Sequence, residues 1–360
     1  MIPYIVIFLL SCAFIFHSQK SEKKWNIWAI IGLLLPCLLA SLRNEEVGTD
    51  TGMYLYIYEN IKEWTLTDFI STKVANVEIF YFFVSLIGEQ ITGFSTLLFI
   101  FQALNVFFLY ETSYRLKNYL SIALVFFLYY IFLYSYSLNI MRQITAVMYI
   151  LWLSHYLIRG KQTIFIAGTF IGMLIHSTAI LGGIIAWICY KVYSAPERNR
   201  KEYLLISIVS IVFLSLVFSK IGGLLALFDI GEMARYGSYL ENETSYIGKT
   251  DLIIRFMFLG LVFYLLSHRL INKNIGYSFI VLLCFEVALI FCGKYSTVIF
   301  RLSLYATAFD ILIVPYLLNL KGITYNSRVI CKMGLILICC VYWWYTVIFN
   351  GTNEIYPYLV

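Results

Sequence analysis

Charged side chains are scarce in this sequence: Asp, Glu, Lys and Arg make up 13% of its 360 residues, while hydrophobic residues make up 61%. Soluble domains usually carry about 25% charged residues, so this deficit excludes an ordinary water-soluble domain. The apolar residues form continuous runs long enough to cross a hydrocarbon core of about 30 Å. Because transmembrane β-strands give shorter, alternating patterns, the sequence predicts an integral membrane protein built from helices.

Signatures of soluble enzymes are also missing. The sequence has no glycine-rich phosphate loop, nucleophile elbow, metal-ligand histidine pair or Asp-x-Asp pair. The eight cysteines lie almost entirely inside apolar runs without metal-ligand spacing, which predicts no disulfide framework and no metal site. The net charge of +6 does not indicate nucleic-acid binding, because the Lys and Arg residues fall in short loops between apolar runs. We therefore expect no cofactor and no nucleic-acid partner.

The apolar runs predict a single polytopic membrane domain over residues 1–360, an all-α helix bundle with about 12 spans. A shorter apolar stretch, 78–92, is predicted to be re-entrant or interfacial. Residues 3–16 lack a basic leader and a clear cleavage site, so we interpret them as a first span rather than a signal peptide. The expected spans are 3–16, 25–42, 94–112, 119–137, 139–158, 162–176, 178–193, 203–219, 252–268, 276–292, 298–320 and 329–349.

Short basic loops predict the orientation, because cytoplasmic loops are rich in Lys and Arg. All of them can be cytoplasmic if an even number of spans separates each neighbouring pair. Both termini then face outward, together with two long polar loops, 43–77 and 220–251. The basic loops are 20–24, 115–117, 159–161, 197–201, 269–273 and 321–332.

A second group of basic residues runs against that rule, because the predicted orientation places it at the outer face. Ionisable residues in or beside spans are costly and usually face a cavity or a partner. Arginine offers a planar fork that suits phosphate oxygens, so an outer cationic surface favours an anionic ligand such as a diphosphate. The group comprises Arg43, Arg142, His176, Arg235, Lys294 and Arg301.

Several of these candidates have an equally open structural interpretation. Arg142 can reach the lipid headgroups or pair with an acidic residue of the 43–77 loop. His176 can bond a carbonyl in a helix turn, and Arg301 can serve as an interfacial anchor. Asp50 can simply form a turn or begin the next helix.

Tyrosines and membrane-buried carboxylates also allow two interpretations. Aromatic faces pack on sugars, but tyrosines populate membrane interfaces in general, which is the favoured interpretation of any single one. Glu286 and Asp310 lie inside apolar runs. We expect them to pair with Lys294 or Arg301, and a proton or ion pathway is the alternative.

Four segments, in order, resemble the EpsG-type proteins, members of the wider group of Wzy polysaccharide polymerases. RNEEVGTDTGMYLY resembles the family's Arg…Val-Gly-Thr-Asp-Thr…Tyr segment, and NIMRQITAVMYILWLSHYLIRGKQ resembles its Arg-Gln-x-x-Ala span. GMLIHSTAIL is similar to its His-Ser-Ala segment, with Thr178 in the place after the serine. FRLSLYATAFDILIVPYLL resembles its late Arg-x-x-x-Tyr…Pro span, and the resemblance covers most of the chain between positions 40 and 320.

The resemblance implies a glycosyltransferase that joins oligosaccharide repeat units at the outer face of the bacterial cytoplasmic membrane. Donor and acceptor are both polyprenyl-diphosphate-linked oligosaccharides, and the product is O-antigen, capsule or exopolysaccharide. The implied architecture is similar to that of multi-pass GT-C glycosyltransferases. Membrane lipid, a chain-length regulator and a flippase are the further expected partners. An O-antigen-type ligase, a membrane acyltransferase and a lipid-linked oligosaccharide flippase remain alternatives.

The implied chemistry assigns roles to the candidate residues. Fixed cations favour departure of a diphosphate, so we expect Arg142 and Arg301 on the diphosphate, with Arg43 or Lys294 in support. These arginines would replace a metal ion.

The acceptor hydroxyl must lose a proton. An imidazole changes charge near neutral pH, which makes His176 the expected general base and Asp50 its competitor. The expected contacts to the acceptor or the growing glycan are Arg235, Tyr236, Tyr239 and Tyr54.

Overall fold

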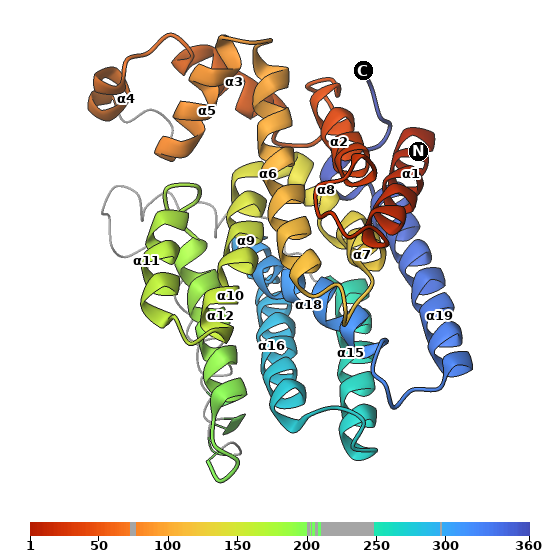
Figure 1. The fold of residues 1–360 in the computed structure, drawn as a ribbon. Coiled ribbons are helices and arrows are strands. Elements are labelled where there is room, and N and C mark those ends of the chain that lie inside the picture. Colours follow the sequence, from red (N-terminus) through yellow and green to blue (C-terminus); the bar gives the residue numbers. More distant parts are fainter. Residues whose placement is uncertain (73–76, 200–201, 203, 206–207, 210–247, 296) are drawn as a thin grey trace. The chain divides into compact units, whose positions relative to one another are not determined.

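A computed structural model describes residues 1–72, 77–199, 202, 204–205, 208–209, 248–295 and 297–360. Over these residues every regular element is a helix, as Figure 1 shows. Most of the span expected at 203–219 and most of the 220–251 loop lie outside the described residues. Six helical segments within the described part are long and apolar enough to cross a membrane. They are Ile2–Gln19, Phe94–Arg115, Lys249–Ser267, Lys273–Cys292, Thr297–Leu317 and Tyr325–Phe349.

The chain divides into two compact units, Met1–Ile180 with Ile311–Val360 (unit 1) and Leu181–Asp310 (unit 2). Several expected spans of unit 1 form shorter or broken helices. The helices of unit 1 are α1 (Ile2–Gln19), α2 (Ile27–Ser41), α3 (Thr51–Ile61), α4 (Leu66–Thr72), α5 (Ile79–Glu89), α6 (Phe94–Arg115), α7 (Ile122–Phe132), α8 (Tyr134–Asn139), α9 (Met141–Leu153), α10 (His155–Ile158), α11 (Gln162–Gly172) and α19 (Tyr325–Trp343), followed by the π-helix η2 (Trp344–Phe349) and the short 3-10 helix η3 (Thr352–Glu354).

Unit 2 contains most of α12 (Ala179–Ser194), all of α15 (Lys249–Ser267), α16 (Lys273–Cys292) and α17 (Thr297–Leu302), and the first half of α18 (Leu304–Leu317). Helices α15 and α16 pack against each other, and α16 also packs against α17. The long helix α16 is capped by Asn272, whose side chain accepts a hydrogen bond from the backbone N–H of Asn274. Such a side-chain cap satisfies a backbone donor that the helix leaves free.

Basic loops of unit 1 meet at one end of its helices. Lys24, in the first basic loop, forms an ion pair with Glu111 near the end of α6. The side-chain amide of Asn319 donates to the carbonyl oxygen of Tyr119 at 3.2 Å, which brings the chain after α18 to the α6–α7 connection. Loops 20–24, 115–117 and the chain leading into 321–332 therefore share one end of unit 1, as the predicted orientation requires.

The opposite end of unit 1 gathers both chain termini. The Tyr4 hydroxyl donates to the carbonyl oxygen of Ile355 at 2.8 Å. The backbone N–H of Asn44, just after α2, donates to the carbonyl oxygen of Leu359 at 2.9 Å. The segment after Asn44 therefore starts at the same end of unit 1 as the two chain termini.

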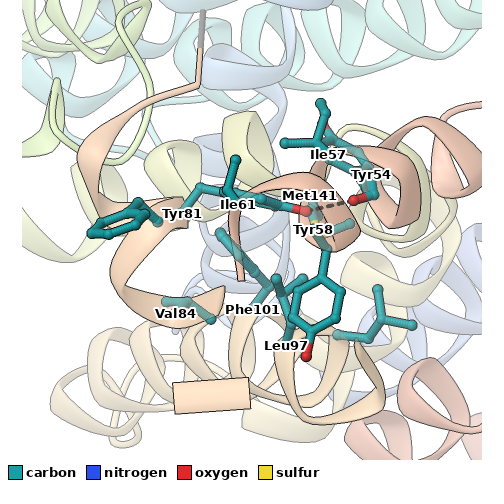
Figure 2. Packing of buried hydrophobic residues seen from close by; sticks show 11 residues of the cluster. Tyr54, Ile57, Tyr58, Ile61, Tyr81, Val84, Leu97, Phe101 and Met141 are labelled. Atoms are coloured by element: carbon teal, nitrogen blue, oxygen red, sulfur yellow. Dashed lines mark hydrogen bonds between the residues drawn. The ribbon is translucent and has the colours of Figure 1, made fainter. Parts of the chain in front are cut away.

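The 43–77 segment was expected as a long polar loop, but much of it is helical. Residues Tyr54, Ile57, Tyr58 and Ile61 recur at a helical spacing and place one apolar face of α3 against α5 and α6. Figure 2 shows this cluster, in which the Tyr81 hydroxyl donates to the backbone carbonyl of Tyr54 at 2.8 Å. Burial of these side chains gives α3 its fixed place.

Helix α5 has 11 residues. It is therefore only about 16 Å long, roughly half the thickness of a bilayer core. The length fits the re-entrant or interfacial segment predicted for 78–92. Helix α5 packs against α3 and α6, so its first residue lies beside a well-packed part of unit 1.

Candidate functional site

The Val-Gly-Thr-Asp-Thr segment forms a turn fixed to the end of α8. Gly48 has a φ of +101°, a region that favours glycine. The Thr49 hydroxyl and the Asp50 backbone N–H both donate to the side-chain oxygen of Asn139, each at 2.7 Å. Asp50 directly precedes α3 and its side chain makes no capping hydrogen bond. Asp50 is half-buried, and the hydrogen bond from its backbone N–H to Asn139 fixes its place in the chain.

Arg142 lies in the first turn of α9, in agreement with its expected position near the start of the span 139–158. Its guanidinium carbon is 5.4 Å from the ring centre of Tyr54 and 5.8 Å from that of Tyr81. A guanidinium held over aromatic rings is attracted by their π-electrons. Tyr54 is itself buried in the α3–α5–α6 cluster. The tyrosine expected to bind sugar therefore contacts the arginine expected to bind diphosphate.

The acidic partner of Arg142 is Glu78, at the N-terminus of α5. The Nη1 atom of Arg142 donates to Oε2 of Glu78, and the two side chains are 12% and 14% exposed. The sequence interpretation allowed an acidic partner from the 43–77 loop, and the residue lies one position beyond that loop. A charge pair this well shielded from water is held in one geometry.

His176 contacts the other oxygen of the same carboxylate. Its Nδ1 atom lies 2.5 Å from Oε1 of Glu78, and the backbone N–H of Ser177 donates to that oxygen at 3.2 Å. The backbone N–H of Phe80 also donates to the carbonyl oxygen of Leu174 at 3.2 Å, which fixes α5 to the turn that carries His176. Glu78 thus connects two residues that the sequence analysis chose independently.

The protonation of Glu78 follows from its two partners. Burial acts to raise the pKa of Glu78, but the hydrogen bond from His176 and the charge of Arg142 outweigh it, so the pKa lies below its ordinary value. An ionised carboxylate only accepts hydrogen bonds, so Nδ1 of His176 carries the hydrogen. In the neutral imidazole the proton-accepting nitrogen is then Nε2.

Sequence reasoning did not select Glu78 as a site residue. It noted only that the apolar stretch 78–92 begins with this acid. The available signal was a carboxylate at the start of a helix too short to cross the membrane. Intramembrane and interfacial charges usually have a partner, and the sequence already offered two basic candidates, Arg142 and His176.

Arg43 is buried, and its side chain supports the fold. Its Nη1 atom donates to the carbonyl oxygen of Ala40 and its Nη2 atom to that of Leu138, both at 2.7 Å. These bonds connect the end of α2 to α8, beside Asn139. Since both terminal nitrogens of Arg43 donate to backbone carbonyl oxygens, the side chain positions the turn that follows it.

The remaining candidates belong to unit 2 or are not described. Lys294 is exposed, with its ammonium 4.5 Å from the ring centre of Tyr295, and Arg301 is a half-buried residue of α17. Glu286 pairs with Arg255 at 2.7 Å, not with Lys294 or Arg301 as expected. The residues outside the described part are Arg235, Tyr236 and Tyr239.

One comparison with known proteins gives a match. The sequence model of the EpsG family matches residues 25–360, which is nearly the whole chain and includes Glu78, Arg142 and His176. The match confirms the family resemblance of the four quoted segments. No curated protein and no solved structure matches the chain.

Proposed function

Because the chain belongs to the EpsG family, we propose that it is a membrane glycosyltransferase that polymerises oligosaccharide repeat units carried on a polyprenyl diphosphate. The family match over residues 25–360 is the observation that carries this function. The candidate membrane-spanning helices support it, because a lipid-linked substrate must be met within the bilayer. The proposal includes a GT-C-like bundle of about 12 spans in the bacterial cytoplasmic membrane.

The end of unit 1 that carries both termini is proposed to face outward. Basic loops gather at the opposite end, and such loops are retained in the cytoplasm. The turn before α3, which is bound to Asn139, follows Arg43 and Asn44 in the chain. Arg43 donates to Leu138 next to Asn139, and Asn44 donates to Leu359 near the C-terminus, so this turn lies at the end of unit 1 that carries the termini. The Arg142–Glu78–His176 group would then meet substrates already presented in the outer leaflet.

In the proposed reaction, an acceptor hydroxyl oxygen attacks the anomeric carbon of the donor sugar. The bond between that carbon and the diphosphate oxygen breaks, and the electron pair leaves with the diphosphate. Arg142 would stabilise the departing charge. The hydroxyl proton passes to Nε2 of His176, so the products are a longer lipid-linked glycan, an imidazolium and a free polyprenyl diphosphate.

Glu78 acts in this scheme as a positioning residue. Its Oε1 atom holds the Nδ1–H of His176 at 2.5 Å, which keeps Nε2 available as the base. Its negative charge also favours the imidazolium that forms when His176 accepts a proton, as the aspartate does in Ser-His-Asp enzymes. The same carboxylate orients Arg142 through Oε2. Asp50 is the competing base and would accept the proton without the help of Glu78.

Deletion of the gene tests the proposal through the surface glycan. Separation of the glycan on a gel should show loss of the long-chain ladder and survival of the band with a single repeat unit. The wild-type gene should restore the ladder. Loss of every surface band, including the single-unit band, would instead indicate a flippase or a ligase and contradict a polymerase.

A further inference from the structure

Unit 2 contains a second group of ionisable side chains, buried between α15, α16 and α18. Arg255 comes from α15, Glu286 from α16 and Asp310 from α18, and their side chains are 3%, 0% and 1% exposed. Asp251, one turn before Arg255, lies 3.9 Å from the Nη1 atom of Arg255. One guanidinium is therefore shared among three carboxyl groups in this described cluster.

Of the three carboxyl groups, that of Glu286 lies closest to the guanidinium of Arg255. Its Oε1 atom lies 2.8 Å from Nε and 2.7 Å from Nη2 of Arg255. The Thr307 hydroxyl donates to the same oxygen at 2.5 Å and accepts from Nη2 of Arg255 at 3.1 Å. Charge-assisted bonds of this kind favour an ionised carboxylate. Glu286 and Arg255 consequently form a neutral pair.

Asp310 is placed differently. Its Oδ2 atom is 4.0 Å from Nε of Arg255, beyond hydrogen-bond distance. Neither oxygen of Asp310 receives a hydrogen bond, and neither does Oε2 of Glu286. The carboxyl groups of Asp310 and Glu286 nevertheless lie within hydrogen-bond reach of each other. Two buried acceptors face each other, and no donor from the described residues lies between them.

A proton on one of the two carboxyl groups would remove the repulsion between them. Two ionised carboxylates in contact repel each other, and burial in an apolar surrounding removes the water that would screen them. If one carboxyl keeps its proton, the repulsive contact becomes an O–H···O hydrogen bond. We propose that Asp310 and Glu286 form a proton-binding site within the membrane-buried part of unit 2, with the proton resident on Asp310 and donated to Oε2 of Glu286.

The assignment of the proton to Asp310 follows from the distances. Oε1 of Glu286 accepts two hydrogen bonds and lies 2.7 Å from Nη2 of Arg255, whereas Asp310 accepts no hydrogen bond from the described residues. A protonated Asp310 adds no charge beside the neutral Arg255–Glu286 pair. Asp310 can therefore be buried beside this pair without adding a charge to it. The site is independent of the proposed glycosyltransferase reaction, because no residue of the Arg142 group takes part.

Infrared spectroscopy of the purified full chain in detergent tests the proposal. A protonated carboxylic acid has a carbonyl stretch distinct from that of a carboxylate, and exposed Asp and Glu residues are ionised at neutral pH. The wild-type protein should show an acid band at pH 7. Asp310→Asn should abolish it, since the amide mimics the protonated acid but gives no acid band. Glu111→Gln is the matched control and should retain it, because Glu111 is ion-paired with Lys24.

Thermal unfolding provides a second measurement with an asymmetric expectation. Asp310→Asn should unfold close to the wild-type temperature, because it keeps a donor toward Glu286. Glu286→Gln should unfold at a clearly lower temperature, because it removes the nearest counter-charge of Arg255. Absence of an acid band in the wild-type protein overturns the proposal even if the variants fail to fold. A band that persists in Asp310→Asn, or stabilisation by sodium without an acid band, also overturns it.

Discussion

Glu78 and His176 are separated by 98 positions in the sequence, yet Oε1 of Glu78 lies 2.5 Å from Nδ1 of His176. The other oxygen of Glu78 pairs with Arg142. A single carboxylate therefore fixes the imidazole and the guanidinium in one geometry, at the N-termini of α5 and α9 and the turn before α12. The relationship makes Glu78 the residue through which the proposed base and the proposed diphosphate ligand depend on each other.

Replacement of Glu78 by glutamine should slow chain elongation by about 100-fold or more, a typical contribution of general acid–base catalysis. The amide retains most of the shape but loses the charge that favours the imidazolium. The acid limb of the pH–rate profile of Glu78→Gln should also lie at lower pH than that of the wild-type protein, because loss of the carboxylate disfavours the imidazolium. Initial rates measured against pH provide the check. Equal pH profiles in the two proteins would show that Glu78 does not act through His176.

Arg142→Ala should abolish long-chain polymer while single-unit glycan is still made. Arg142→Lys should retain only a part of the activity, because an ammonium keeps the charge but loses the planar two-pronged contact. Arg159→Ala, in an exposed basic loop, is the matched control and should leave the ladder intact. A normal ladder from Arg142→Ala would contradict the diphosphate assignment.

Arg142→Ala also leaves a largely buried carboxylate without its arginine, so a stability measurement must accompany the activity assay. Loss of one partner of a buried ion pair typically costs about 3–5 kcal/mol. His176 still contacts Glu78 in this variant and should reduce that cost. Folded protein in the membrane fraction, measured by detergent extraction and size exclusion, separates a chemical defect from unfolding.

The lowered pKa of Glu78 predicts a direction for acid unfolding. A carboxyl whose pKa in the folded protein is below its ordinary value of 4.5 contributes stability above that value. The contribution decreases as pH falls through the folded pKa. The melting-temperature difference between wild type and Glu78→Gln should therefore be constant from pH 5.5 to 7 and shrink below 4.5. A difference that grows toward acid pH would reverse this sign.

Gly182 in α12 should tolerate no larger residue. A Cβ atom at this position would lie 2.1 Å from a ring carbon of Tyr305, so Gly182→Ala forces the tyrosine or the helix to move. Gly260→Ala in α15 is the control, because a Cβ atom there meets nothing within 4 Å. Gly260→Ala should be neutral or stabilise by roughly 0.5–1 kcal/mol. Thermal unfolding should therefore rank Gly182→Ala well below both Gly260→Ala and the wild type.

The helical nature of the chain and its family could be predicted from the sequence because both depend on local patterns. Long apolar runs fix helices such as α6 and α16, and the family match confirmed the resemblance of the quoted segments. The helices within 43–77 were missed, since Tyr54 and Tyr58 are buried by α5 and α6 rather than by their own neighbours in the sequence. Tertiary packing there outweighed a polar composition.

The candidate site was only partly predictable, for a related reason. Arg142 and His176 stand out as single charges beside apolar runs, so the sequence alone could select them. The roles of Glu78 and Arg255 depend on partners that are distant along the chain, which a local sequence pattern does not reveal. Glu286 was consequently assigned to the nearest basic residues in sequence rather than to Arg255, one helix earlier.

Reconstitution of the purified chain in liposomes with polyprenyl-diphosphate-linked repeat units tests the central claim most directly. The account predicts lipid-linked glycans that lengthen by whole repeat units, with one free polyprenyl diphosphate released for each bond formed. His176→Ala should stop both processes together while the protein remains folded. Movement of the lipid-linked units across the bilayer without lengthening, or lengthening that continues in His176→Ala, would contradict the account.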